Sequence, residues 1–228
     1  MKRLSFYLLL ALAPLSFAQD LSADEILENL TAAAESLQDA RFTLTGEVID
    51  PDGTQLPIEI DVQVVPETKL ARAEFFQPDA LADNFIVLDG EAVYNYVFLT
   101  NQVTVLPADD PDALGGLFPE GNVDQGFDFT FDPNQLFRGW SASVESYGDS
   151  PVGSVYTMRY TNAEAAAIVS YVEAQIVDEQ WFPYTMTFYD QDGEQLAKLI
   201  LEDFVRDQGL DPGEVTYVPD DAEIIDER

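Results

Sequence analysis

Carboxylates are the only abundant side chains in this sequence that could carry acid–base chemistry. The chain has 43 Asp and Glu residues against 10 Lys and Arg residues, and it has neither His nor Cys. Without them, a Ser-His-Asp triad, a Cys-His pair or a His-based metal site cannot be built. The sequence also lacks a G-x-S-x-G elbow, a P-loop and a dinucleotide fingerprint. The remaining enzyme hypothesis is a glycosidase with two carboxylates, and we expect the protein not to be an enzyme.

Two short motifs with chemical potential have ordinary structural explanations. Asp190-Gln-Asp192-Gly193 resembles the start of a calcium loop, but the third acidic position and the closing Glu are missing. We therefore predict a hairpin turn at this position, and no metal ion or other cofactor. Asn29-Leu-Thr31 fits a glycosylation acceptor, but it lies inside a predicted helix and is discounted.

The N-terminus has the pattern of a secretory signal peptide. Lys2 and Arg3 precede an apolar run, and small residues then lead to Ala18. The run is too short to span a bilayer, which disfavours the alternative of a membrane anchor. We therefore expect a signal peptide over residues 1–18, a single domain over residues 19–228, and a periplasmic or external location.

The predicted mature chain is strongly acidic. Loss of Lys2 and Arg3 changes the net charge from −33 to −35. Binding to nucleic acid or to an anionic membrane surface requires clustered Lys and Arg, so the composition excludes both as direct partners. Apolar residues make up 46% of the chain, which suffices for a sizeable core without disulfides.

The elements that must position any site begin with one helix. Ser22 and Glu25 form a capping box, and apolar residues then recur at helical spacing as far as Leu37. From residue 41 the apolar period changes to two, and turns such as Asp89-Gly90 separate the runs. Successive short strands joined by tight turns predict a mainly β (α+β) fold, built as a large curved antiparallel sheet or a barrel, whose last strand covers residues 214–218.

The hairpin NFIVLDGEAVYNYVF, residues 84–98, is apolar on both faces. A two-residue turn at Asp89-Gly90 would pair Leu88 with Glu91 and Phe85 with Tyr94. Each apolar face then needs a cover. We predict that the more aromatic face lines an apolar concavity and that the other packs outside it. The aromatic face carries Phe85, Val87, Ala92, Tyr94, Tyr96 and Phe98.

One connection is too long for a hairpin. Residues 107–126 include Leu114, Leu117 and Phe118 beside a Gly-Gly pair. Loops of this length inside a compact domain are usually functional or disordered. We interpret the segment as a short helix or lid over the concavity, with disorder as the alternative.

Three motifs together resemble the LolA family of periplasmic outer-membrane lipoprotein carriers. They are Pro66–Phe75 with Arg72, the hairpin NFIVLDGEAVYNY, and the ending GLDPGEVTYVPDDAEIID. The resemblance covers essentially the whole mature chain. It implies an unclosed half-barrel, with an N-terminal helix and short lid helices over an apolar concavity that holds acyl chains of lipoproteins.

The leading hypothesis is a periplasmic carrier, monomeric and without covalent chemistry, for the acyl chains of lipoproteins or free lipids. Such a carrier would have transfer partners at the inner and outer membranes. The alternative is an envelope sensor or scaffold domain of the same fold that binds a protein partner. The predicted acyl-binding residues are Phe75, Phe85, Val87, Tyr94, Tyr96, Phe98 and Trp140, and the predicted lid or lid-contact residues are Arg72, Leu114, Leu117 and Phe118.

Overall fold

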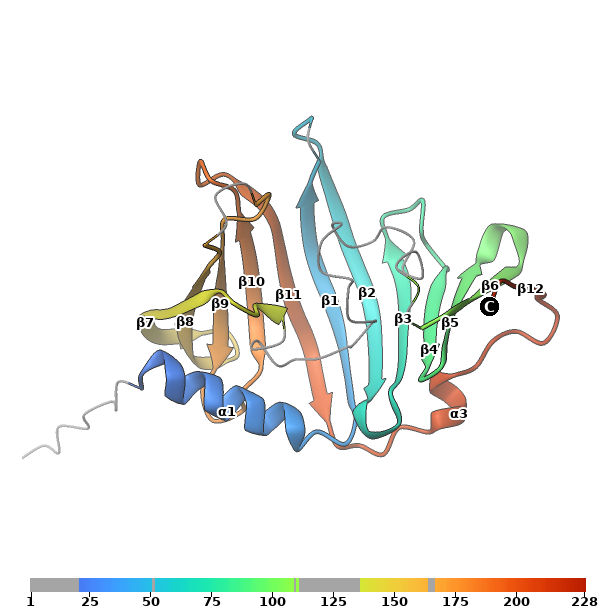
Figure 1. Ribbon diagram of the computed structural model, residues 1–228, viewed down its shortest axis with the longest axis horizontal. Coiled ribbons are helices and arrows are strands. Elements are labelled where there is room, and N and C mark those ends of the chain that lie inside the picture. The colour runs from blue at the N-terminus through green and yellow to red at the C-terminus, as the bar shows by residue number, and fades with distance from the viewer. Residues whose placement is uncertain (1–20, 51, 109, 111–135, 164–166) are drawn as a thin grey trace, which may run out of the picture.

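The computed structural model describes residues 21–228 apart from 51, 109, 111–135 and 164–166, and it shows one large sheet with helices at its sides (Figure 1). The predicted signal peptide and the predicted lid residues Leu114, Leu117 and Phe118 lie outside the described residues. The strands are β1 (Ala40–Ile49), β2 (Gln55–Val65), β3 (Leu70–Gln77), β4 (Phe85–Asp89), β5 (Ala92–Val97), β6 (Gln102–Pro107), β7 (Ser141–Ser150), β8 (Gly153–Thr161), β9 (Tyr171–Val177), β10 (Pro183–Tyr189), β11 (Gln195–Arg206) and β12 (Glu223–Asp226).

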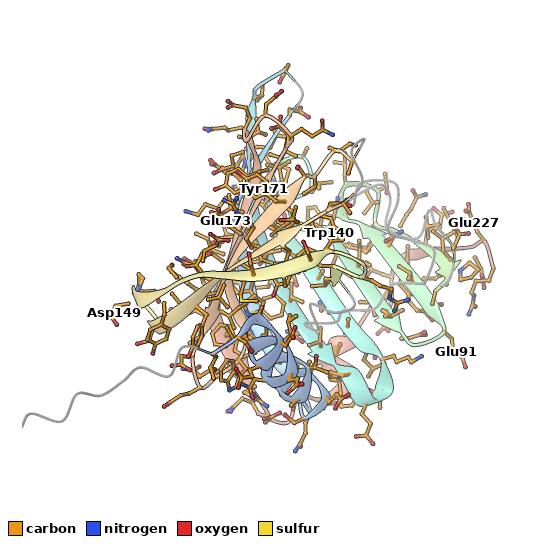
Figure 2. All side chains as sticks on the ribbon, turned by 60° about the vertical axis from the view of Figure 1, so that its left-hand side comes forward. Glu91, Trp140, Asp149, Tyr171, Glu173 and Glu227 are labelled. Atoms are coloured by element: carbon orange, nitrogen blue, oxygen red, sulfur yellow. The ribbon has the colours of Figure 1, made fainter. Side chains whose placement is uncertain are left out.

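The sheet of 12 strands has the order β12-β6-β5-β4-β3-β2-β1-β11-β10-β9-β8-β7 and does not close into a barrel. All neighbours are antiparallel except β12, which runs parallel to β6. Figure 2 shows Tyr171 and Glu173 toward one end of this sheet and Glu91 and Glu227 toward the other. The predicted mainly β fold with a single, unclosed sheet is confirmed.

Helix α1 (Ala23–Glu35) forms where the capping box predicts it. The Ser22 side chain accepts a hydrogen bond from the Glu25 backbone at 3.3 Å, and Glu25 accepts one from the Ser22 backbone at 2.9 Å. Its apolar stripe, centred on Ile26 and Leu30, packs against β8 and β9 (Figure 1). In the described part of the chain, no helix has the length and apolar run needed to cross a bilayer.

The strand register separates the sheet into two chemically different faces. The face that carries α1, here called the helix-bearing face, is apolar from β4 to β8, and its paired positions include Ile86, Ala73, Val62, Leu201, Met186, Ala174 and Met158. Along β1, β2, β3, β8, β9 and β10 no charged side chain occupies this face, and β11 has one, Arg206, at its last residue. The opposite or outer face of β1, β11, β9 and β8 is polar, with Glu47, Lys198, Glu173 and Arg159 in one row.

The hairpin between β4 and β5 corrects the predicted pairing by two residues. Phe85 pairs with Tyr96 and Leu88 with Val93, instead of Tyr94 and Glu91. The turn is wider than two residues because the Asp89 carboxylate accepts hydrogen bonds from the backbones of Glu91 (3.0 Å) and Ala92 (2.8 Å). A shift of two residues leaves every side chain on its predicted face.

The C-terminal segment, residues 207–228, runs across the outer face of β3–β6. It contains a short helix, α3 (Pro212–Val215), where the sequence suggested a strand, because Asp211 caps the backbone of Gly213 at 2.8 Å and Pro212 takes the first helical position. Val218 and Ala222 then pack against a buried cluster, and β12 adds to the sheet edge. The cluster consists of Phe85, Val87, Ala92, Tyr96, Val103 and Val105.

Candidate functional site

The candidate site is an apolar crevice on the helix-bearing face, between α1 and strands β8–β10. Its volume is about 10 Å³, the room of roughly one water molecule. The crevice is therefore closed in this conformation, and a larger ligand requires side chains to move. Its lining residues are Leu30, Leu136, Phe137, Tyr160, Ala174, Ile176, Pro183 and Met186.

Two aromatic rings cover the crevice from the segment that precedes β7. The Phe137 ring stacks on the Tyr160 ring with centroids 4.5 Å apart, and the Trp140 ring lies 5.3 Å from Phe137. The Trp140 backbone donates a hydrogen bond to the Phe137 carbonyl at 3.0 Å, which holds the pair together. Leu136 beside them is 43% exposed. Leu136, Phe137 and Trp140 therefore form an apolar cover over the crevice, and the outer side of this cover is in contact with solvent.

The crevice has the chemistry of a binding site for an apolar ligand. The only polar side-chain group among its lining residues is the hydroxyl of Tyr160. Within the described residues, no group of three or more Asp or Glu side chains is placed to hold a metal ion. The arrangement excludes water and offers contact area, and it places no acid or base against a bound molecule.

The structure corrects the predicted orientation of the aromatic hairpin face. Phe85, Val87, Tyr94 and Tyr96 lie on the outer face, so the prediction that they line the concavity is wrong. The physical reason is that both hairpin faces are apolar, and the C-terminal segment covers the more aromatic one. The hairpin side chains on the helix-bearing face are Ile86, Leu88 and Val93 instead.

The other predicted contact residues lie in different places. Phe75 is buried on the helix-bearing face beside Phe42 and Val62, and Trp140 is half-buried beside the crevice. Phe98 is 57% exposed in a short 3-10 turn, η2 (Phe98–Thr100), between β5 and β6. Their contact with acyl chains stays a prediction.

Arg72 fastens the C-terminal segment to the outer face. Its guanidinium lies 3.9 Å from the centre of the Phe85 ring and donates a 2.8 Å hydrogen bond to the Tyr217 carbonyl. Only 12% of the side chain is exposed, and burial holds the pKa of Arg72 below its usual value although Glu74, at 3.5 Å, opposes the shift. The sequence predicted that Arg72 would hold lid carbonyls, and among the described residues the carbonyl that it binds belongs to the C-terminal segment.

The Tyr94 hydroxyl forms its hydrogen bond within the hairpin. Its hydroxyl donates to Asp89 at 2.8 Å. Burial raises the pKa of Asp89, but the hydrogen bonds from the Glu91 and Ala92 backbones and from Tyr94 lower it more, so the pKa of Asp89 lies below its ordinary value. Asp89 and Tyr94 therefore stabilise the turn, and neither faces the crevice.

Sequence reasoning missed most of the crevice residues. Leu30 belongs to the apolar stripe of the predicted helix, and Tyr160, Ala174 and Met186 lie in strands. Periodicity shows that such positions are buried, without showing which buried positions meet. Phe137 had no periodic signal at all.

Replacing Arg72 with Met is expected to loosen the C-terminal segment without impairing the crevice. Met keeps the apolar stem over Phe85 but cannot donate to the Tyr217 carbonyl, and a hydrogen bond from a charged donor contributes about 1.5–3 kcal/mol. Hydrogen exchange should accelerate at residues 216–222, with acyl-probe binding unchanged. Arg72→Lys, which keeps the charge, should show a smaller effect. Altered probe binding with an unchanged exchange pattern would contradict this role.

Comparison with known proteins shows similarity in structure, and neither a family model nor a curated protein matches the sequence. An uncharacterised conserved protein from Thermus thermophilus has 21% identity and a TM-score of 0.63, covering 90% of this chain and 98% of its own. The Pseudomonas aeruginosa MucA/MucB complex has 14% identity and a TM-score of 0.52, covering 86% of this chain and 60% of that chain. Mycobacterium tuberculosis lipoprotein LppX has 10% identity and a TM-score of 0.51, covering 82% of this chain and 98% of its own.

These identities are too low to carry activity or cargo from one protein to another, but the alignments extend over most of this chain. TM-scores of 0.51–0.63 over this share of the chain show similarity in fold. The chain therefore has the LolA-like fold, as its sequence motifs predict.

Proposed function

We propose that the protein is a periplasmic carrier that holds acyl chains of lipoproteins or free lipids against the helix-bearing face of its sheet. The observation that carries the proposal is the apolar surface from β4 to β8, which has Arg206 at its margin and no carboxylate, with α1 and the Phe137–Trp140 pair lying over one half of it. In a protein with a net charge of −33, so large a surface without carboxylates calls for a function. The signal-peptide pattern supports a periplasmic location, and the LolA-like fold supports a carrier of lipids or lipoproteins.

Binding would work by exchange of apolar contacts. An acyl chain enters between α1 and β9 as Phe137 and Leu136 move outward, and it replaces their contacts with Ala174 and Met186. Each buried methylene contributes roughly 0.8 kcal/mol, so ten methylenes supply about 8 kcal/mol before the costs of ordering and of opening the crevice are subtracted. Release needs only a competing apolar surface, because no covalent bond is formed.

The test is direct binding of an uncharged fluorescent acyl ester to protein stripped of lipid with detergent. The carrier proposal expects saturable binding at one or a few sites, and mass spectrometry of protein purified without detergent should identify a co-purifying acylated molecule. A delipidated, folded protein that binds no acyl probe would refute the proposal.

The alternative is an envelope sensor that binds a protein partner. It is favoured by one observation, the structural similarity to MucB, which was solved in complex with MucA. A pull-down distinguishes the two functions. After detergent has removed lipid, a sensor retains a stoichiometric protein partner and binds no acyl probe, whereas a carrier binds the acyl probe.

A further inference from the structure

An exposed apolar tip projects from the turn between β5 and β6. Val97, Phe98 and Leu99 are consecutive, and their exposed fractions are 41%, 57% and 91%. Single exposed apolar residues are common, but three in a row at the end of a hairpin form a local patch that stays exposed in the part of the chain that the structure describes. The helix-bearing face does not include Phe98 or Leu99, so acyl binding in the crevice does not explain them.

The tip is held in a fixed conformation by its neighbour Asn101, which adopts a left-handed backbone at φ 51°. The Asn101 backbone donates to the Phe98 carbonyl at 3.2 Å and accepts from Glu223 at 2.9 Å. Its side chain accepts from the Tyr96 hydroxyl at 3.1 Å and donates to the Asp221 carbonyl at 3.0 Å. All four polar groups of Asn101 thus secure the turn. A rigid apolar tip loses little conformational entropy on binding, which favours recognition.

A second anchor comes from the adjoining hairpin. The side chain of Asn84 accepts a hydrogen bond from the Phe98 backbone at 2.9 Å. These hydrogen bonds hold two acidic segments beside the tip. Asp83 precedes Asn84 in sequence, and Asp220 and Asp221 belong to the segment that the Asn101 side chain binds; all three residues are exposed.

The chain segments around the tip are strongly acidic. Residues 73–110 contain seven Asp and Glu residues and no Lys or Arg. The C-terminal segment, residues 207–228, contains eight Asp and Glu residues and one cation, Arg228, which is paired with Asp226 at 2.7 Å. The two segments meet at the tip through β12 and Asn101. An anionic lipid surface would be repelled here, whereas a positively charged protein surface would be attracted.

The geometry points to Val97–Leu99 as a docking tip for a protein partner whose apolar pocket is bordered by Lys and Arg. Leu99 and Phe98 fill the pocket, and the carboxylates of Asp83, Asp220 and Asp221 face the basic border. Apolar anchors of this kind determine the lifetime of a complex, and the charges around them raise its association rate. The tip lies apart from the crevice, so docking and acyl binding are separable.

The experiment places photoreactive p-benzoylphenylalanine at position 99 of the full-length protein in the cells that produce it. The matched control has the same residue at position 168, because Ile168 is another exposed apolar side chain, at 71%, between strands at the other end of the sheet order. A discrete protein adduct is expected from position 99 and not from position 168. Equal adducts from both positions, or none from position 99, would overturn the inference.

The captured protein is then purified and titrated with three forms of this chain. Leu99→Ser should weaken the dissociation constant by roughly tenfold or more, as expected for the loss of a buried anchor. The combined change Asp83→Asn, Asp220→Asn and Asp221→Asn should slow association and flatten its dependence on NaCl. Acyl-probe binding and the melting temperature should not change in Leu99→Ser. A dissociation constant that is unchanged in Leu99→Ser would overturn the proposal. The proposal would also be overturned if the wild-type protein floated with phosphatidylcholine vesicles and Leu99→Ser did not, because the tip would then be a membrane contact.

Discussion

Phe137→Asp is expected to abolish binding of an uncharged acyl probe while leaving the protein folded. Phe137 is half-buried at the mouth of the crevice, so a carboxylate there keeps contact with water in the empty protein. An acyl chain that fills the crevice would have to remove that water, at a cost of several kcal/mol. A cost of about 3 kcal/mol already weakens binding more than 100-fold. Fluorescence titration of delipidated protein measures the loss.

Two matched variants identify the cause of that loss. Phe76→Asp makes the same chemical change on a side chain that is 39% exposed on β3, away from the crevice, and it should leave probe affinity within about twofold. Phe137→Leu removes the aromatic ring without adding charge and should preserve binding. Similar losses in Phe76→Asp and Phe137→Asp, or full binding by Phe137→Asp, would locate the acyl site elsewhere.

Asp39→Ala is expected to lower the free energy of unfolding by about 2–5 kcal/mol, a large part of the ~5–15 kcal/mol typical of a domain. Asp39 is only 6% exposed, at the junction of α1, β1 and β11. Its two carboxylate oxygens accept hydrogen bonds from the backbones of Gln208 and Gly209, both at 2.9 Å. Alanine would remove both acceptor oxygens from these backbone N–H groups.

Urea denaturation followed by tryptophan fluorescence measures this change. Asp39→Asn keeps the shape and one acceptor oxygen but directs an amide group at a backbone N–H, so its stability should be intermediate. Asp192→Ala, a loss of an exposed carboxylate in a hairpin turn, should shift the free energy of unfolding by less than about 0.5 kcal/mol. A stability of Asp39→Ala equal to that of Asp192→Ala would show that the Asp39 bonds contribute nothing.

Local patterns in the sequence determined the elements of this protein. The capping box at Ser22 and the apolar stripe behind it specify α1, because both depend on residues within three turns of one another. The alternation along 84–98 specifies which side chains share a face, and that assignment survived a register error of two residues. The absence of His and Cys restricts chemistry without reference to any fold.

The tertiary structure alone decided which face of the hairpin points toward the helix. Both faces are apolar, so the answer depends on what covers each. Val218 and Ala222 cover Phe85 and Tyr96 from more than a hundred residues further along the chain. The crevice likewise brings together Leu30, Phe137 and Met186, from three distant segments. Periodicity reports the burial of each residue against some neighbour, but only the pairing order of the strands brings those neighbours together.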